Sequence, residues 1–224
     1  MLLAKAPALG RVKTRLVPPL SPAQALLLHE AMLLDQIRFL RRLASPEFEV
    51  EVRVDGPLPP GAVPTALRGI PVRAQGDGDL GARMRRAAEE AFAAGAGRAG
   101  LLGGDAPTLP AALVRRALER VRDDADAAVV PALDGGYVFL VLRPGALGLL
   151  EQITWGSPLV LAETRSRASA AGLRLEETEA WGDLDSASDL ARTAGEAERD
   201  PARASATRAF LSGLGMDFGD ARVL

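Results

Sequence analysis

The chain of 224 residues has no cysteine and a single histidine, His29. The first absence excludes disulfides, thiolate metal sites and a cysteine nucleophile, and the second excludes a cluster of histidines. Aromatic residues make up only 4% of the sequence, too few for a platform on which nucleic-acid bases stack. The formal net charge of -2 provides no basic field for nucleic acid either. We therefore expect no nucleic-acid partner.

Long apolar runs are also missing. No segment approaches the roughly 18 apolar residues that a membrane helix needs, and the opening "MLLAKAP" is too short and too quickly polar for a signal peptide. We expect no membrane insertion and a cytoplasmic location, which the lack of cysteine fits. The length suits one α/β domain with an ample core. Nothing in the sequence indicates the oligomeric state.

Short strands and helices are predicted to alternate along the chain. The strand candidates are "MLLA", "FEVEVRV", "IPVRAQ", "AGLLGG", "AAVVPA", "YVFLVL" and "LRLEE". The strongest helix begins at Ser21, which forms a capping box with Gln24; His29 lies inside this helix, where a structural role is favoured. This order predicts an α/β fold: a three-layer, open, mostly parallel but mixed sheet. We expect one domain over residues 1–224, with 200–224 as a C-terminal helical extension.

Lysine is scarce too: Lys5 and Lys13 are the only lysines, and every other lysine-or-arginine position is arginine. Both lie in "AKAPALGRVKTRL", where Gly10 permits a tight backbone and Arg11 and Arg15 add positive charge. A loop of this kind at a strand end can surround a polyphosphate with backbone N–H groups and cations. It is not a Walker motif. A basic loop that only faces solvent is the alternative.

Aspartates follow two other predicted segments. Asp105 in "GGDAPTL" comes directly after a buried strand, and Asp183 and Asp185 alternate in "WGDLDSASDL". Mg²⁺ commonly takes one or two carboxylates together with substrate phosphates, so one aspartate from each segment is sufficient. In sheets of this class the strand ends meet at one rim, where ligands bind. The alternative for Asp105 is that it caps the next helix.

A third candidate is the turn "LDGGY". Asp134, Gly135 and Gly136 suit a hairpin turn, and hairpin geometry alone would explain the glycines. Paired glycines also let a ligand approach the backbone closely. Tyr137 is the only tyrosine, and Trp155 in "ITWGSPLV" either covers such a ligand or fills the core, which is the favoured reading.

Taken in order, the motifs "AKAPALGRVKTRL", "QGDGDLGARM", "GGDAPTL", "DGGYVFL", "TWGSPLV" and "DLDSASDL" resemble the DUF2064 glycosyltransferase-like family of the nucleotide-diphospho-sugar transferase (GT-A) superfamily. The chain is also similar to the molybdenum-cofactor and 2-phospho-lactate guanylyltransferases. The resemblance implies Mg²⁺ or Mn²⁺ held against a nucleotide's phosphates. It assigns phosphate binding to the glycine loop with Lys13 and Arg15, the metal to Asp105 and Asp185, and the acceptor or sugar to 134–137.

Two positions depart from the pattern of the family. Ser186 stands where threonine is usual, and a glycine common after the "DGGY" strand is missing from "DGGYVFLVL". The second departure weakens the transfer of the acceptor assignment.

Three functions remain open at this stage. The first is a metal-dependent transferase that moves a sugar from a nucleotide donor to a small-molecule acceptor, with Lys13 stabilising the departing phosphates. The second is a nucleotidyltransferase that moves a nucleoside monophosphate from a triphosphate to a phosphorylated acceptor. The third is a non-catalytic nucleotide-binding protein. For sugar transfer, Asp134 is the candidate general base.

Overall fold

The structure, a computed structural model, describes residues 1–58 and 65–215. Residues 59–64, and residues 216–224 of the predicted C-terminal extension, lie outside them. Seven strands of a mixed sheet alternate with helices, which confirms the predicted α/β fold. Within the described residues, every helix is too short or too polar to cross a membrane.

The chain divides into two compact units. We name them the central unit (Met1, Arg73–Gly103 and Pro110–Trp181) and the terminal unit (Leu2–Val72, Gly104–Leu109 and Gly182–Leu224). Strand β3 (Val72–Ala74) lies where the chain passes from the terminal unit to the central unit. The sequence predicts a single domain, and that remains a prediction.

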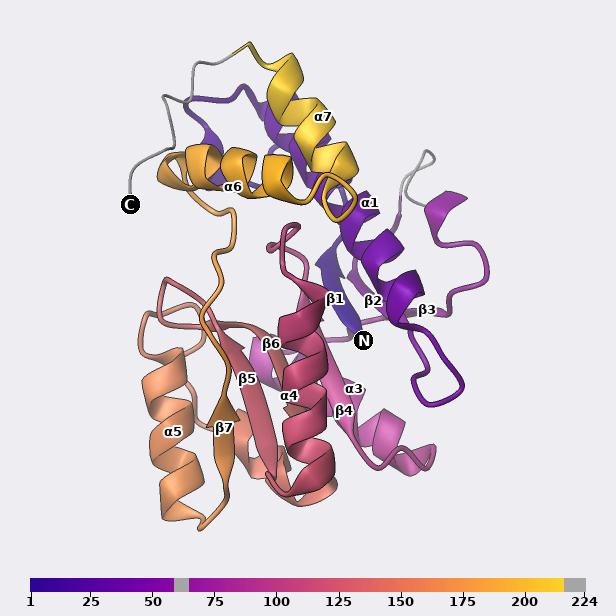
Figure 1. Cartoon of the computed structure of the whole chain (residues 1–224), viewed down its shortest axis with the longest axis vertical. Helices are drawn as coiled ribbons and strands as arrows, with labels where there is room; N and C mark the ends of the chain where they lie inside the picture. Colours follow the sequence, from indigo (N-terminus) through magenta and orange to yellow (C-terminus); the bar gives the residue numbers. More distant parts are fainter. Residues whose placement is uncertain (59–64, 216–224) are drawn as a thin grey trace. The chain divides into compact units, whose positions relative to one another are not determined.

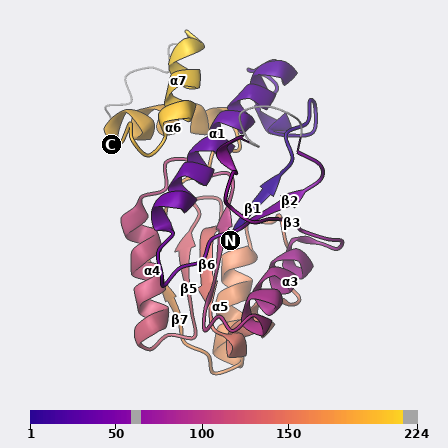
Figure 2. The same cartoon turned by 90° about the vertical axis from the view of Figure 1, so that its right-hand side faces the viewer.

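The central unit is a sandwich of helices around four strands in the order β4-β6-β5-β7, with β6 antiparallel to β4 and β5, and β7 parallel to β5. Figure 2 shows α4 on one side of these strands and α3 and α5 on the other. The elements are α3 (Leu80–Ala93), β4 (Ala99–Gly103), α4 (Ala111–Asp123), β5 (Ala127–Pro131), β6 (Tyr137–Leu142), a 3-10 segment (Pro144–Leu150), α5 (Val160–Ala170) and β7 (Leu175–Glu177).

Apolar spacing explains how α4 packs. Leu113, Val114, Ala117 and Val121 are its buried residues, and their spacing places them on one helical face. Strand β5 is buried at every position, as expected for a strand with neighbours on both edges and a helix over its face. These two patterns were readable from the sequence alone.

In its described part, the terminal unit contains a parallel strand pair and the helices α1, α6 and α7, labelled in Figure 1. Its elements are β1 (Leu2–Lys5), a 3-10 turn (Thr14–Leu16), α1 (Pro22–Leu43), β2 (Val52–Asp55), α6 (Ala187–Arg199) and α7 (Ser205–Gly213). The predicted capping box of α1 is present, since the Ser21 side chain accepts from the Gln24 amide and the Gln24 side chain accepts from the Ser21 amide.

Strand β2 differs from its prediction. The alternation in "FEVEVRV" predicts a half-covered strand, but Arg53 is buried as deeply as its neighbours. Its guanidinium donates to the Glu51 carboxylate at 2.6 Å, which neutralises the buried charge. Period-two patterns do not detect a buried ion pair.

One hydrophobic cluster joins distant parts of the terminal unit. It contains Leu16 from the basic loop, Leu28 from α1, Leu184 from the segment before α6, Leu190 from α6 and Leu211 from α7. All five side chains are at most 2% exposed. The cluster therefore holds the segments that bear Lys13 and Asp185 against a common helical support.

The packing of this cluster predicts the effect of truncating Leu28. Leu28→Ala removes a fully buried side chain and should lower the free energy of unfolding by about 2–5 kcal/mol. Leu27 is the matched control, because it lies on the same helix but is 53% exposed. Leu27→Ala should change stability by about 0.5 kcal/mol or less. Urea denaturation measures both, and equal losses in the two variants would contradict the described core.

Candidate functional site

Lys13 occupies the centre of the candidate site in the terminal unit. Its backbone lies in the left-handed region (φ 49°, ψ 37°), which side-chain-bearing residues seldom adopt, directly before the Thr14–Leu16 turn. Its side chain is only 4% exposed. The ammonium lies 2.5 Å from Asp105 Oδ1 and 2.7 Å from Asp185 Oδ1, and it donates to the Leu184 carbonyl at 2.6 Å. Three segments distant in sequence thus meet at one nitrogen.

Electrostatics keep this cluster ionised. Burial opposes a charge on Lys13, but the two aspartates outweigh it and raise its pKa above the ordinary value. Burial likewise opposes the charge on Asp105, yet the ammonium of Lys13 prevails and holds the pKa of that carboxyl below its usual range. The site therefore holds one cation between two acidic side chains near neutral pH.

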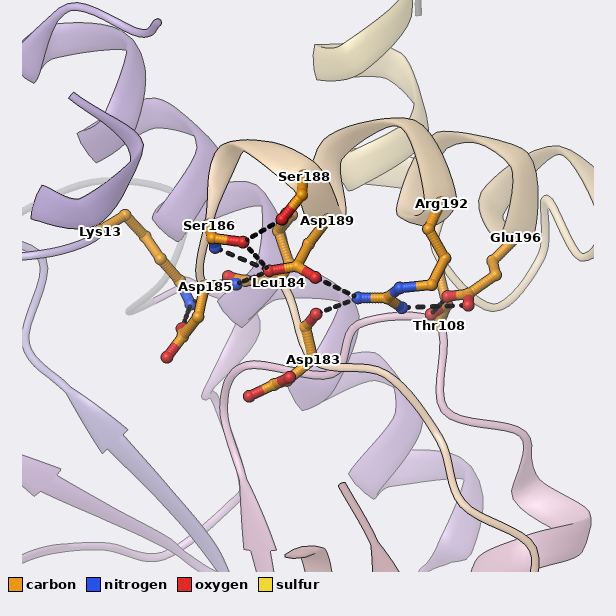
Figure 3. Close-up of polar contacts among 10 residues, drawn as sticks. All are labelled: Lys13, Thr108, Asp183, Leu184, Asp185, Ser186, Ser188, Asp189, Arg192 and Glu196. Atoms are coloured by element: carbon orange, nitrogen blue, oxygen red, sulfur yellow. Dashed lines mark hydrogen bonds and ion pairs between the residues drawn. The ribbon is translucent and has the colours of Figure 1, made fainter. Parts of the chain in front are cut away.

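The Asp185 segment is oriented by the start of α6. Ser186 and Asp189 form a capping box, and Asp189 Oδ2 accepts from the backbone amides of Ser186 at 2.7 Å and Asp185 at 3.2 Å (Figure 3). Because a side chain holds the amide of Asp185 itself, the carboxylate leaves a fixed backbone position.

Arg192 braces the same turn from inside α6. Its guanidinium donates to the Asp183 carbonyl, to Asp189 Oδ1 at 3.2 Å and to Glu196 Oε1 at 3.1 Å (Figure 3). Glu196 also accepts a hydrogen bond at 2.5 Å from the hydroxyl of Thr108, which lies three residues after Asp105. The network therefore ties the two aspartate segments together.

Two further contacts fix the Asp105 segment. The Asp105 carbonyl accepts from the Leu184 amide at 2.8 Å, and the Ala106 carbonyl accepts from Gln36 Nε2, buried within α1, at 2.9 Å. No pattern in the sequence singled out Gln36, Arg192 or Glu196. The i,i+4 spacing of Arg192 and Glu196 was the only available signal, and this spacing is common on solvent-facing helices.

The remaining basic residues of the loop are exposed. The side chain of Arg15 is 75% exposed and reaches 4.0 Å from Asp185 Oδ2. Lys5 and Arg11 are exposed as well, and Gly10 has a positive φ of 72°. The buried His29 hydrogen-bonds through Nε2 to the Lys5 carbonyl at 3.0 Å, which gives it a structural contact to the end of β1. Cations available to an incoming anion thus lie beside the buried Lys13.

A divalent metal fits this donor set. In residues 1–58 and 65–215 no group of three or more His, Cys, Asp or Glu side chains could hold a metal. Two carboxylates and the Leu184 carbonyl nevertheless already surround one cation, the ammonium of Lys13. Mg²⁺ prefers such oxygen donors and often completes its coordination with water and phosphate. Asp105 and Asp185 match that requirement.

The predicted "DGGY" turn lies entirely within the central unit. Asp134 is exposed, and its Oδ1 accepts from the Gly136 amide at 3.0 Å. Gly135 has a φ of 93°, and a Cβ there would lie 2.2 Å from the Pro158 carbonyl oxygen. The Gly135 carbonyl accepts from the Leu161 amide at 2.9 Å. Glycine is therefore required at 135 for the turn to dock on the start of α5.

Tyr137 and Trp155 pack edge to face, with ring centroids 6.2 Å apart. Burial raises the pKa of the Tyr137 phenol, so this group stays neutral and does not act as a base. Trp155 is partly buried and packs on α3, where a Cβ at Gly81 would meet its indole nitrogen. Both rings support the turn, and a role of either in contacting an acceptor remains a prediction.

The brace formed by Arg192 predicts a measurable loss of stability. Arg192→Met removes charge-assisted hydrogen bonds from a side chain that is 26% exposed and should lower the free energy of unfolding by about 1.5–3 kcal/mol. Arg199→Met, an exposed position in the last turn of the same helix, should cost about 0.5 kcal/mol or less. Chemical denaturation of both variants is the measurement. If Arg192→Met were as stable as Arg199→Met, the brace would be energetically unimportant.

Solved structures share the fold of the chain. A protein of Desulfovibrio desulfuricans G20, provisionally described as a nucleotide-diphospho-sugar transferase, is 29% identical, with a TM-score of 0.80 over 95% of this chain and 92% of its own. A CMP:2-keto-3-deoxy-manno-octonic acid synthetase in complex with CTP is 16% identical (TM-score 0.51, 89% and 98% covered). A cytidylyltransferase of Leptospira borgpetersenii is 12% identical (0.50, 100% and 97%). The last two show the fold alone.

The family comparison agrees with the resemblance in sequence. No curated protein matches the chain. A family model described as "Uncharacterized protein conserved in bacteria (DUF2064)" matches residues 39–157. The chain has the fold of the nucleotide-diphospho-sugar transferases, and because the family match spans more than half of its length, it belongs to the DUF2064 family.

Proposed function

We propose that this protein is a transferase that uses a nucleotide-activated sugar and a divalent metal ion. The observation that supports this most is the meeting of Lys13, Asp105 and Asp185 at distances of 2.5–2.7 Å. A basic loop and two carboxylates in one place suit a pyrophosphate and its metal. The likeness to the D. desulfuricans protein supports the same class of donor.

The basic loop would bind the phosphates of the donor. Arg11, Arg15 and Lys5 are exposed cations, and the backbone at Gly10 is open, with no atom within 4 Å of a Cβ placed there. When the sugar is transferred, negative charge grows on the departing nucleoside diphosphate. Lys13 and Arg15 would offset this charge, and each such preorganised contact is typically worth a few kcal/mol in the transition state.

Asp105 and Asp185 would hold Mg²⁺ or Mn²⁺, which supplies Lewis-acid stabilisation of the leaving phosphates. The chain's own contribution is to fix the two carboxylates. It does so through the Asp189 side chain on one segment and the Gln36 side chain on the other. Prior fixation reduces the reorganisation needed when the metal and donor bind.

The turn of the central unit would face the small-molecule acceptor. The exposed carboxylate of Asp134 is the group we assign as general base toward an acceptor hydroxyl. Gly135 and Gly136 would let the acceptor approach the backbone, and Tyr137 and Trp155 would support the turn from behind.

Nucleotidyl transfer is the second candidate, and the charge of the loop favours it. Four basic residues within eleven positions, Lys5, Arg11, Lys13 and Arg15, suit three phosphates at least as well as two. In that reaction an acceptor phosphate attacks the α-phosphorus of a nucleoside triphosphate and pyrophosphate leaves. The same metal and loop would serve it. A non-catalytic role is less favoured because both proposed metal ligands are present.

Donor class can be read from thermal stabilisation. A panel of nucleoside triphosphates and nucleotide-sugars, each with Mg²⁺, should raise the Tm for at least one nucleotide-sugar, because a ligand at 100 times its Kd adds about 2.7 kcal/mol. Stabilisation by a triphosphate and by no nucleotide-sugar would reverse the order of the two candidates. No stabilisation by any member would contradict both.

The metal assignment predicts a contrast among aspartates. Asp105→Asn and Asp185→Asn should abolish the Mg²⁺-dependent part of nucleotide stabilisation and lower transfer activity by about 100-fold or more. Asp183→Asn is the matched control, because Asp183 alternates with Asp185 but Lys13 contacts only the latter of the two. Calorimetric titration of nucleotide with and without Mg²⁺ measures the effect. Equal losses in all three variants would contradict the assignment to Asp185.

A further inference from the structure

The ammonium of Lys13 has no proton left for a phosphate. An ammonium carries three donors, and those of Lys13 are directed at three oxygens: Asp105 Oδ1, Asp185 Oδ1 and the Leu184 carbonyl. The side chain is 4% exposed, so water does not compete for it. Lys13 can contact a donor phosphate only after it gives up at least one of these partners.

A divalent cation would bind to the same two carboxylates. A Mg²⁺ ion binds oxygen at about 2.0–2.1 Å, whereas the nitrogen of Lys13 already lies 2.5 and 2.7 Å from one oxygen of each carboxylate. A second cation inserted here would share ligands with the ammonium at close range and be repelled by it. The buried Lys13 therefore competes directly with free metal.

A polyphosphate removes this conflict. Its oxygens offer Lys13 new acceptors, and its negative charge balances a second cation beside the ammonium. Arg15 and Arg11 stand exposed next to Lys13 and favour the arrival of that anion. Binding of the metal and binding of the phosphate thus each favour the other.

We infer that Lys13 is a specificity-determining residue: it excludes free divalent cations from Asp105 and Asp185 and admits a metal only together with a polyphosphate. This inference rests on the proposed roles of the two aspartates and the basic loop. The protein's true ligand is then the metal–polyphosphate complex. Metal and polyphosphate are coupled, so each tightens the binding of the other by the same factor.

Electron paramagnetic resonance of free Mn²⁺, titrated into metal-stripped protein without any nucleotide, tests the exclusion. Lys13→Met removes the competing cation and should bind one Mn²⁺ at least about fivefold tighter than the parent, the lower end of typical couplings between ligands. Arg199→Met is the control, since it removes an exposed charge from the last turn of α6, outside the basic loop and the aspartate segments, and should behave like the parent. Equal affinities of the parent and Lys13→Met, or no binding by Lys13→Met, overturn the inference.

A second measurement needs no substitution. Calorimetry of the unmodified protein with inorganic pyrophosphate, in the presence and absence of Mn²⁺, should show affinity at least about fivefold higher with the metal. Pyrophosphate binding that ignores Mn²⁺ overturns the inference. If circular dichroism shows that both Lys13→Met and its alternative, Lys13→Gln, fail to fold, this calorimetric measurement alone tests the inference.

The two tests separate this inference from the proposed function. Neither contains a sugar or a nucleoside. If Lys13→Met binds Mn²⁺ more tightly than the parent but no nucleotide-sugar stabilises the parent, the exclusion of free metal by Lys13 stands and the assignment as a sugar transferase fails. A protein that is stabilised by a nucleotide-sugar but binds Mn²⁺ equally with and without Lys13 shows the reverse.

Discussion

The arrangement of the terminal unit depends on a buried ammonium placed between two carboxylates. Without Lys13, Asp105 and Asp185 would be two like charges held side by side by a rigid backbone, an arrangement that normally forces one of them to take up a proton. Lys13 holds the pKa of Asp105 below its usual range, and the two carboxylates in turn keep the lysine charged in a buried position. Each group thus makes the state of the others possible.

This cluster requires a stiff support, and the chain provides one in two parts. Leucines from the basic loop, α1, α6 and α7 form a common hydrophobic cluster under the site. Above it, buried polar side chains hold backbone groups of the aspartate segments. Arg203, two residues before α7, extends this network: it donates to the Leu109 carbonyl at 2.7 Å and to Gln36 at 2.6 Å, and burial lowers its pKa to about 9. The C-terminal helix is therefore part of the scaffold of the site.

The two units contribute different chemistry. The terminal unit concentrates charge that suits phosphates and a metal. The central unit contributes an exposed carboxylate on a glycine turn, supported by aromatic packing. Both proposed reactions would use the charge of the terminal unit, whereas only the proposed sugar transfer would use the carboxylate of Asp134 as a base, so the identity of the donor separates the two proposals.

Local patterns in the sequence were sufficient for the seven strands and the capping box at Ser21, because these features depend on neighbouring residues. Strand-end position also singled out Lys13, Asp105 and Asp185 as candidates for one site. Only the tertiary structure showed that the ammonium of Lys13 donates all three of its hydrogen bonds to the two aspartates and a carbonyl. It also showed that Gln36 and Arg192 donate to backbone carbonyls of the two aspartate segments, and that Arg53 is buried in an ion pair with Glu51. These contacts join residues up to 172 positions apart or depend on depth in the core, and neither quantity is encoded in local periodicity.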